Sequence, residues 1–222
     1  MSSKVWDRLE DAVEHHTLSK RSFVALMSIW TLLGFAVTWG GSLLTAGTKM
    51  GWGYGILLFI GMMMGSVMAG ASEYLVISLT GYGLLTLFMG MLLGPTLAQY
   101  THASLVHVLG TTGILCVGLT GIGVLYPESL ESWGIYLFGG LLLLIVGMYS
   151  TAICAAFGMP VGFSYTWIDW IAIILFSAYL IYDMNRAMRI NRTLLNSLRC
   201  ATAAYLDILN IFLHLLNLNR DD

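Results

Sequence analysis

The chain has 222 residues, of which 58% are hydrophobic and only 10% are charged. Soluble domains carry roughly a quarter charged residues, so this chain has too few charges to cover a water-exposed surface. Its formal net charge of -2 gives no electrostatic signature of a nucleic-acid partner. The composition therefore excludes a soluble enzyme and predicts a polytopic protein whose main partner is the lipid bilayer.

Long uncharged segments predict the membrane spans. Residues 22–48, 50–72, 74–127 and 132–168 contain no Asp, Glu, Lys or Arg, and one span requires about 20 apolar residues. Pro95 is expected to end the third helix because proline has no N–H to donate, and Gly158 and Pro160 are expected to end the fifth. Seven helices are predicted, at residues 22–48, 54–71, 74–95, 104–126, 133–157, 165–184 and 197–218. The predicted fold is all-α, a seven-transmembrane helix bundle at 22–218 that follows an N-terminal segment at 1–21 and precedes a short tail at 219–222.

Glycines recur at four-residue spacing in two of the predicted helices, as Gly61 with Gly65 and Gly90 with Gly94. Small residues at this spacing let helices approach closely in lipid. These glycines are therefore expected to serve helix packing.

Basic residues predict the orientation in the membrane, because cytoplasmic loops carry an excess of Lys and Arg. Eight of the ten precede the first helix or lie around the connection between the last two: Lys4, Arg8, Lys20, Arg21, Arg186, Arg189, Arg192 and Arg199. With seven spans these two regions lie on the same side. The N-terminus is therefore expected in the cytoplasm and the C-terminus outside. A bacterial plasma (inner) membrane is the expected location, because the short N-terminus has no Pro-rich extension and no retention tail follows.

Ionisable groups inside spans are costly and thus mark functional candidates. Asp169 lies between Trp167 and Trp170, which are residues typical of the membrane interface. We expect Asp169 to be solvated there, and Glu73 to be solvated in its tight turn.

Asp207 lies about 15 Å into the last predicted helix, near the middle of the membrane. Asn210, His214 and Asn217 follow it at offsets that place all four side chains on one stripe of a helix. Such a stripe faces protein or water and not lipid. It is either a hydrogen-bonding seam between helices or, in the interpretation we favour, the polar lining of a pathway.

Asp183 lies at the cytoplasmic end of the sixth predicted helix, with Arg186 as a candidate ion-pair partner. The short connection to the last helix makes the two helices antiparallel neighbours, so that Asp183 and Asp207 are able to meet. Two carboxyls in contact do not both ionise at low cost, and their protons belong to the pair. Without a proton they repel each other or together contact a hard cation such as Ca²⁺.

The last two helices carry a recognisable motif. The run Leu175–Asp183 (LFSAYLIYD) is followed, 24 positions after Asp183, by Asp207 in Ala204–Phe212 (AYLDILNIF). This pattern resembles the Bax inhibitor-1 (transmembrane Bax-inhibitor-motif) family, bacterial type, as do the seven predicted helices, the length and the Gly94-Pro95 pair. The resemblance implies a pH-controlled, calcium-permeable leak in which the two aspartates form a diaspartyl gate at the cytoplasmic side. Some members also place a basic residue at the turn between the second and third helices, where this chain has Gly70, Ala71, Ser72 and Glu73.

These features are compatible with three functions. The first is a pH-sensitive calcium leak channel or ion-homeostasis protein gated by Asp183 and Asp207, with no cofactor and with calcium and protons as its ligands. The alternative is a non-conducting regulator that binds another membrane protein, such as a membrane protease or a stress or cell-death factor. An intramembrane hydrolase is the weakest, because the sequence contains no His-Glu-x-x-His, Gly-x-Ser-x-Gly or Gly-x-Gly-Asp motif. We therefore expect no enzyme and no catalytic residue.

Overall fold

The computed structural model describes residues 17–158 and 165–220, and these residues form seven helices. Their bounds are α2 (Lys20–Thr45), α3 (Trp52–Ala71), α4 (Leu75–Leu97), α5 (His102–Leu125), α6 (Trp133–Ala156), α7 (Tyr165–Ala187) and α8 (Leu194–Leu218). All seven are long and apolar enough to cross a membrane. The predicted all-α transmembrane fold is confirmed for the described chain. The expected break at Pro160 and residues 1–16 of the N-terminal segment lie outside it.

Four of the helices in the described chain begin two or three residues earlier than predicted, and side chains cap two of them, α2 and α8. The Ser19 hydroxyl accepts a hydrogen bond from the Ser22 N–H at 3.1 Å, so that α2 begins at Lys20. In the same way, the Thr193 hydroxyl accepts from the Asn196 N–H at 3.1 Å, and α8 begins three residues before the predicted start. Each cap satisfies a backbone donor that the first turn of a helix leaves free.

The prediction that Pro95 ends its helix is wrong, because α4 continues through Pro95 to Leu97. A residue with an N–H at position 95 would donate to the carbonyl of Met91, which proline leaves without a partner. The Thr45 hydroxyl of α2 donates to that carbonyl instead, at 2.7 Å. A neighbouring helix thus supplies the hydrogen bond that the proline removes.

We expect Thr45→Val to destabilise the protein by about 1–3 kcal/mol, because it leaves the partly buried Met91 carbonyl without a hydrogen-bond partner. Thermal unfolding in detergent measures the effect. The matched control is Thr80→Val in α4, since the Thr80 hydroxyl is exposed and donates only within its own helix. In a Pro95→Ala background the new N–H can pair with Met91, so Thr45→Val should cost less there. An equal cost in both backgrounds would contradict this account of α4.

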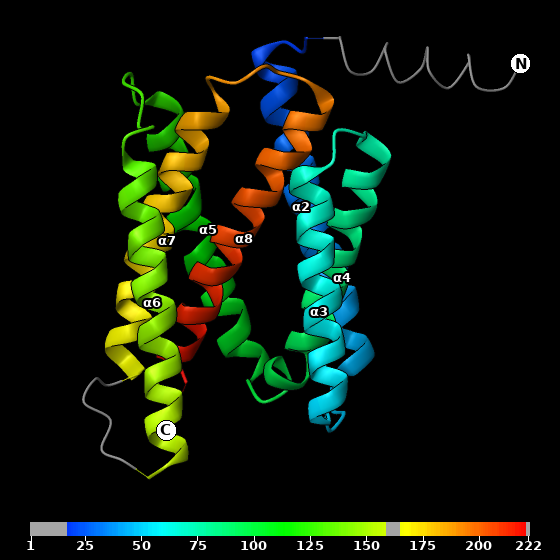
Figure 1. Ribbon diagram of the computed structural model, residues 1–222, viewed down its shortest axis with the longest axis vertical. Coiled ribbons are helices and arrows are strands. Elements are labelled where there is room, and N and C mark those ends of the chain that lie inside the picture. The colour runs from blue at the N-terminus through cyan, green and yellow to red at the C-terminus, as the bar shows by residue number, and fades with distance from the viewer. Residues whose placement is uncertain (1–16, 159–164, 221–222) are drawn as a thin grey trace, which may run out of the picture. The chain divides into compact units, whose positions relative to one another are not determined.

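The described chain divides into two compact units, of which the first contains residues 17–101 and 189–205. In this unit α4 packs against both α2 and α3 (Figure 1). The contacts are close because glycines form them: a Cβ on Gly90 would overlap the carbonyl of Thr38, and one on Gly65 would meet the backbone of Gly81 and Leu85. The predicted packing role of the glycines is confirmed here.

Within the first unit, a buried hydroxyl also joins α2 and α4 to the part of α8 that belongs to this unit. Thr38 Oγ1 donates to a backbone carbonyl, either Gly34 of its own helix at 2.9 Å or Thr86 of α4 at 3.1 Å. Since Thr38 has one hydroxyl proton, its 2.6 Å contact with the Tyr205 hydroxyl requires Tyr205 to be the donor. Three helices therefore meet at one oxygen atom.

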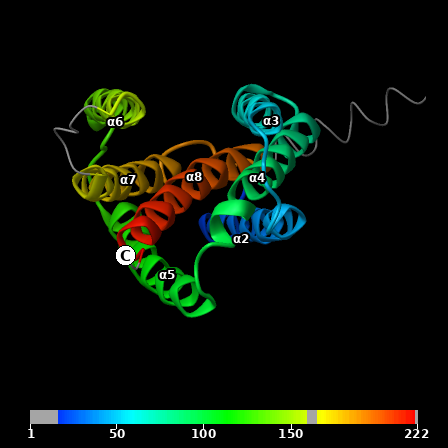
Figure 2. The ribbon, with the colours of Figure 1, turned by 90° about the horizontal axis from the view of Figure 1, so that it is seen from below.

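The second unit contains the described residues 102–158, 165–188 and 206–220. Here α7 packs against both α5 and α6 (Figure 2). Gly123 of α5 lies against the backbone of Ile181, and a small core of Leu144, Ile168 and Ala172 joins α6 to α7. This unit contains α7 and the second part of α8, and hence all the predicted site residues.

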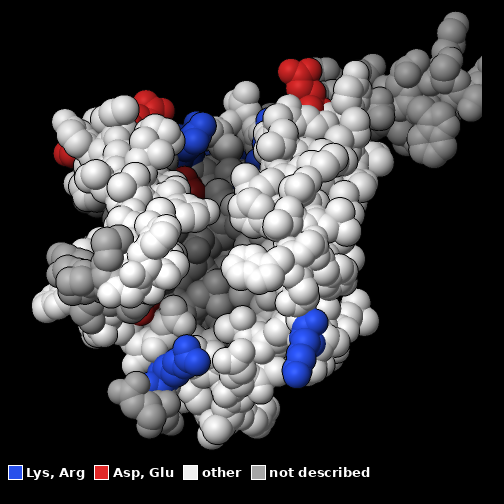
Figure 3. Space-filling model, turned by 60° about the horizontal axis from the view of Figure 1, so that its bottom comes forward, with Lys and Arg blue, Asp and Glu red and all other residues white. Residues whose placement is uncertain are grey.

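The outer surface is apolar, as a lipid-facing surface must be. Trp52 is 91% exposed and Ile114 is 80% exposed, and large apolar side chains are exposed on every helix from α2 to α7. The face in Figure 3 has few charged side chains over most of its area. Such a surface is stable in hydrocarbon and would aggregate in water.

Candidate functional site

The structure brings the two predicted aspartates into contact. The carboxyls of Asp183 in α7 and Asp207 in α8 are joined by a side-chain hydrogen bond. Asp207 is only 6% exposed, and Asp183 is partly buried. Since an ionised carboxylate only accepts hydrogen bonds, this contact requires a proton on one of the two groups. The pair is thus arranged to hold a single proton between two helices.

One oxygen of the pair has no hydrogen-bond partner. Oδ2 of Asp207 is fully buried and unpaired within the described structure. Buried polar atoms are nearly always satisfied, so an exception calls for a physical explanation. An unpaired carboxyl oxygen is able to accept a hydrogen bond from water or to contact a cation.

Three other side chains lie within electrostatic range of the pair. The positive charge of Arg186 acts on Asp183, although the Arg186 side chain is exposed. Tyr179 of α7 is close to both carboxyls, and the Cys116 thiol of α5 is close to Asp207. Sequence reasoning missed the last two. The spacing of Tyr179, one helical turn before Asp183, was a usable signal, whereas nothing local marks Cys116.

Asn185 is a further residue that sequence reasoning missed. It is 2% exposed, and its amide donates to the carbonyls of Tyr126 at 3.1 Å and Glu128 at 3.0 Å. Its Oδ1 accepts from the Leu130 N–H at 3.1 Å. The connection between α5 and α6 is therefore fastened to α7 two residues after Asp183.

The polar stripe on α8 faces α7 over part of its length. The His214 ring contacts Asp169 at 2.6 Å, and the Asn217 amide donates to the same Asp169 oxygen at 3.4 Å. Asn210 donates within its own helix, to Leu206 at 2.8 Å. The contacts of His214 and Asn217 are those that an interhelical seam requires. The role of Asn210, His214 and Asn217 in lining a pathway stays a prediction.

The expectation that Asp169 is solvated is wrong. Asp169 is only 8% exposed, and its carboxylate pairs with His214 of α8. The flanking tryptophans are exposed, as interfacial residues are, but Asp169 lies on the opposite, inward side of α7. Glu73 is exposed, as predicted.

A basic side chain does reach the turn between α3 and α4, but it comes from α8. Arg199 Nη2 donates to the Ser72 carbonyl at 2.7 Å. The sequence around the turn contains no Arg or Lys, so this contact could not be read from that segment. Within the first unit, Arg199 fastens the turn to the beginning of α8.

The described residues contain no group of three or more His, Cys, Asp or Glu side chains arranged to hold a metal ion. Calcium takes six to eight oxygen ligands in a stable site, and the aspartate pair offers only two carboxyls. These donors fit a passing hydrated cation better than a permanently bound one.

The comparisons with known proteins agree with this architecture. The family described as "Inhibitor of apoptosis-promoting Bax1" matches residues 20–220. A protein of Vibrio cholerae serotype O1 described as an uncharacterized membrane protein is 28% identical over 137 residues. The match covers 59% of this chain and 57% of the length of that relative.

Proposed function

Because the chain belongs to the Bax inhibitor-1 family, we propose that this multi-pass membrane protein forms a proton-regulated calcium leak pathway. Asp183 and Asp207 are its gate. The observation that carries the proposal is the hydrogen bond between their carboxyls, together with the unpaired oxygen that Asp207 keeps beside it. We assign the protein no catalytic chemistry, resident cofactor or nucleic-acid partner.

The proposed mechanism follows from the number of protons on the pair. With one shared proton the carboxyls attract each other and hold α7 against α8, which closes the pathway. With no proton, two negative charges repel at close range. A calcium ion that enters then meets carboxylate oxygens, which are the ligands it favours. Protons and calcium compete for the same oxygens, so efflux should increase as the pH rises through the titration of the pair.

Calcium efflux from liposomes tests this function directly. Purified protein is reconstituted with a calcium indicator outside the vesicles, and efflux is followed from about pH 5 to about pH 8. We expect efflux above that of protein-free liposomes, with a rate that rises with pH. An efflux equal to that of protein-free liposomes at every pH would reject the leak and favour the non-conducting regulator that binds a membrane-protein partner.

We also propose that the N-terminus and the connection between α7 and α8 are cytoplasmic, in a bacterial inner membrane. Cysteine labelling tests this orientation in a background where the free thiols of Cys116, Cys154 and Cys200 are replaced by alanine. A membrane-impermeant reagent should label Arg192→Cys only from the cytoplasmic side. It should label the control Lys49→Cys, at an exposed position between α2 and α3, only from the outside. Labelling of Arg192→Cys from the outside alone would reverse the orientation.

A further inference from the structure

Asp169 and His214 form a second buried couple between α7 and α8. The His214 Nδ1 atom lies 2.6 Å from Asp169 Oδ1, and the two side chains are 9% and 11% exposed, respectively. Asp169 precedes Asp183 by fourteen residues in α7, about 21 Å along the helix. This couple is therefore separate from the Asp183–Asp207 pair.

The contact determines which histidine nitrogen carries a proton. An ionised carboxylate only accepts, so the 2.6 Å contact requires a proton on His214 Nδ1. In the neutral ring the other nitrogen, Nε2, then has a free lone pair. Nε2 has no hydrogen-bond partner in the described residues, yet it is not among their fully buried unpaired atoms. The ring is held in place by a near-parallel contact with Phe176, at 6.2 Å between ring centres.

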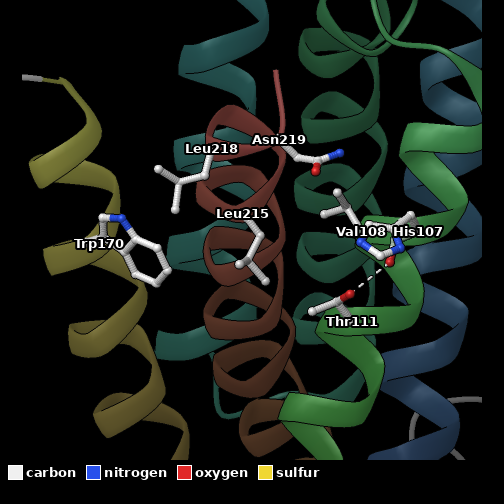
Figure 4. Close-up of a pocket in the computed structure, with 7 residues that line it drawn as sticks. All are labelled: His107, Val108, Thr111, Trp170, Leu215, Leu218 and Asn219. Carbon is white, nitrogen blue, oxygen red and sulfur yellow. Dashed lines mark hydrogen bonds between the residues drawn. The ribbon is translucent and has the colours of Figure 1, made fainter. Parts of the chain in front are cut away.

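Few other charged groups surround the couple. On α7 the acidic partner is Asp169 itself, and α6, which packs on α7, contains no Asp, Glu, His, Lys or Arg. On α5, His107 lines a cavity of about 150 Å³ together with Trp170 and Leu215, the chain neighbours of Asp169 and His214 (Figure 4). This volume is sufficient for several water molecules, which occupy about 30 Å³ each. Asp169 and His214 do not themselves line this cavity, and their own access to water is the 11% and 9% of their side chains that is exposed.

We propose that His214 and Asp169 constitute a second proton-binding site of this protein. His214 Nε2 takes up the proton from water, and the resulting imidazolium is neutralised by the Asp169 carboxylate. Asp169 is the positioning residue, because it fixes the tautomer and supplies the opposite charge. Protonation turns the contact between α7 and α8 from a hydrogen bond between a neutral ring and a carboxylate into a hydrogen-bonded ion pair, in which both partners are charged.

Nitrogen NMR of the imidazole rings tests this site without reference to calcium flux. Protein with ¹⁵N-labelled histidine is placed in lipid nanodiscs, and His214→Gln identifies the His214 signals among those of the five histidines. From about pH 5 to about pH 8, Nδ1 should keep its proton while Nε2 gains one as the pH falls. Asp169→Asn should populate the tautomer with its proton on Nε2, because an amide N–H can donate to Nδ1 whereas an ionised carboxylate cannot. Asp169→Glu keeps a carboxylate and should keep the proton on Nδ1.

Two controls separate this site from its surroundings. His107→Gln and Asp183→Asn should leave the His214 tautomer unchanged, since no contact joins either residue to the ring in the described structure. A neutral wild-type ring with its proton on Nε2 would overturn the proposal, as would a tautomer that Asp169→Asn does not change. The tautomer is read on the wild-type protein, so this test holds even if a variant fails to fold. It also holds if the protein conducts no calcium.

Discussion

In liposomes, Asp183→Asn and Asp207→Asn are each expected to flatten the pH dependence of calcium efflux. The wild-type rate should change by up to about tenfold per pH unit near the titration of the pair, because one pH unit changes the free energy of one protonation by about 1.4 kcal/mol. An asparagine amide neither shares a proton with the remaining carboxyl nor ionises. Each variant therefore loses the coupled titration, and its efflux should vary little between about pH 5 and about pH 8.

The double variant should behave like either single variant, since groups that act as a unit are not additive. Glu73→Gln serves as the matched control, because Glu73 is an exposed acid remote in sequence from both aspartates. It should keep the wild-type pH profile. If both single variants also keep that profile, the aspartates have a structural role only, and the proposed gate is refuted.

Gly90→Ala is expected to produce the largest loss of stability among single methyl additions to α4. The added Cβ would overlap the backbone carbonyl of Thr38, which cannot rotate away as a side chain can. Overpacking of this kind costs about 1–3 kcal/mol, which lowers the midpoint of thermal unfolding by about 2–4 °C for each kcal/mol. The shift of α2 should also disturb the hydrogen bond between Thr38 and Tyr205.

Gly83→Ala is the natural control for this measurement. Gly83 lies in the same helix, and a Cβ there would meet no heavy atom within 4 Å. Alanine is favoured over glycine in a helix by about 1 kcal/mol, so this variant should be as stable as the wild type or slightly more stable. Similar melting points for the two variants would show that α2 and α4 are not in close backbone contact.

The number and approximate position of the helices could be predicted from the sequence, because an uncharged run of span length has few alternatives to a helix in lipid. The helix ends could not be predicted as well. Ser19 and Thr193 extend α2 and α8 through single side-chain hydrogen bonds. A hydropathy pattern does not reveal such bonds. The continuation through Pro95 depends on Thr45 of another helix, and no local pattern around the proline contains that information.

In the candidate site, too, some contacts could be predicted from the local sequence, and others join residues that are far apart in the chain. The spacing of Asp183 and Asp207 on antiparallel neighbours made their meeting feasible, and their side chains do meet. Asp169 was misplaced because the two tryptophans beside it indicate an interface, whereas its partner His214 is 45 residues away. The amide of Asn185 likewise binds atoms more than 50 residues earlier in the chain. Long-range pairing of this kind is decided by packing, which one sequence does not display.

The hydrogen bond between Thr38 and Tyr205 has a consequence for biosynthesis. The two residues are 167 positions apart, so a ribosome completes α2, α3 and α4 long before it reaches α8. Until then the Thr38 hydroxyl binds only carbonyls of α2 and α4, and its oxygen lacks the donor that Tyr205 provides. The contact between α2 and α4 is thus completed only when α8 has been inserted, and a nascent chain interrupted before α8 lacks this interhelical hydrogen bond.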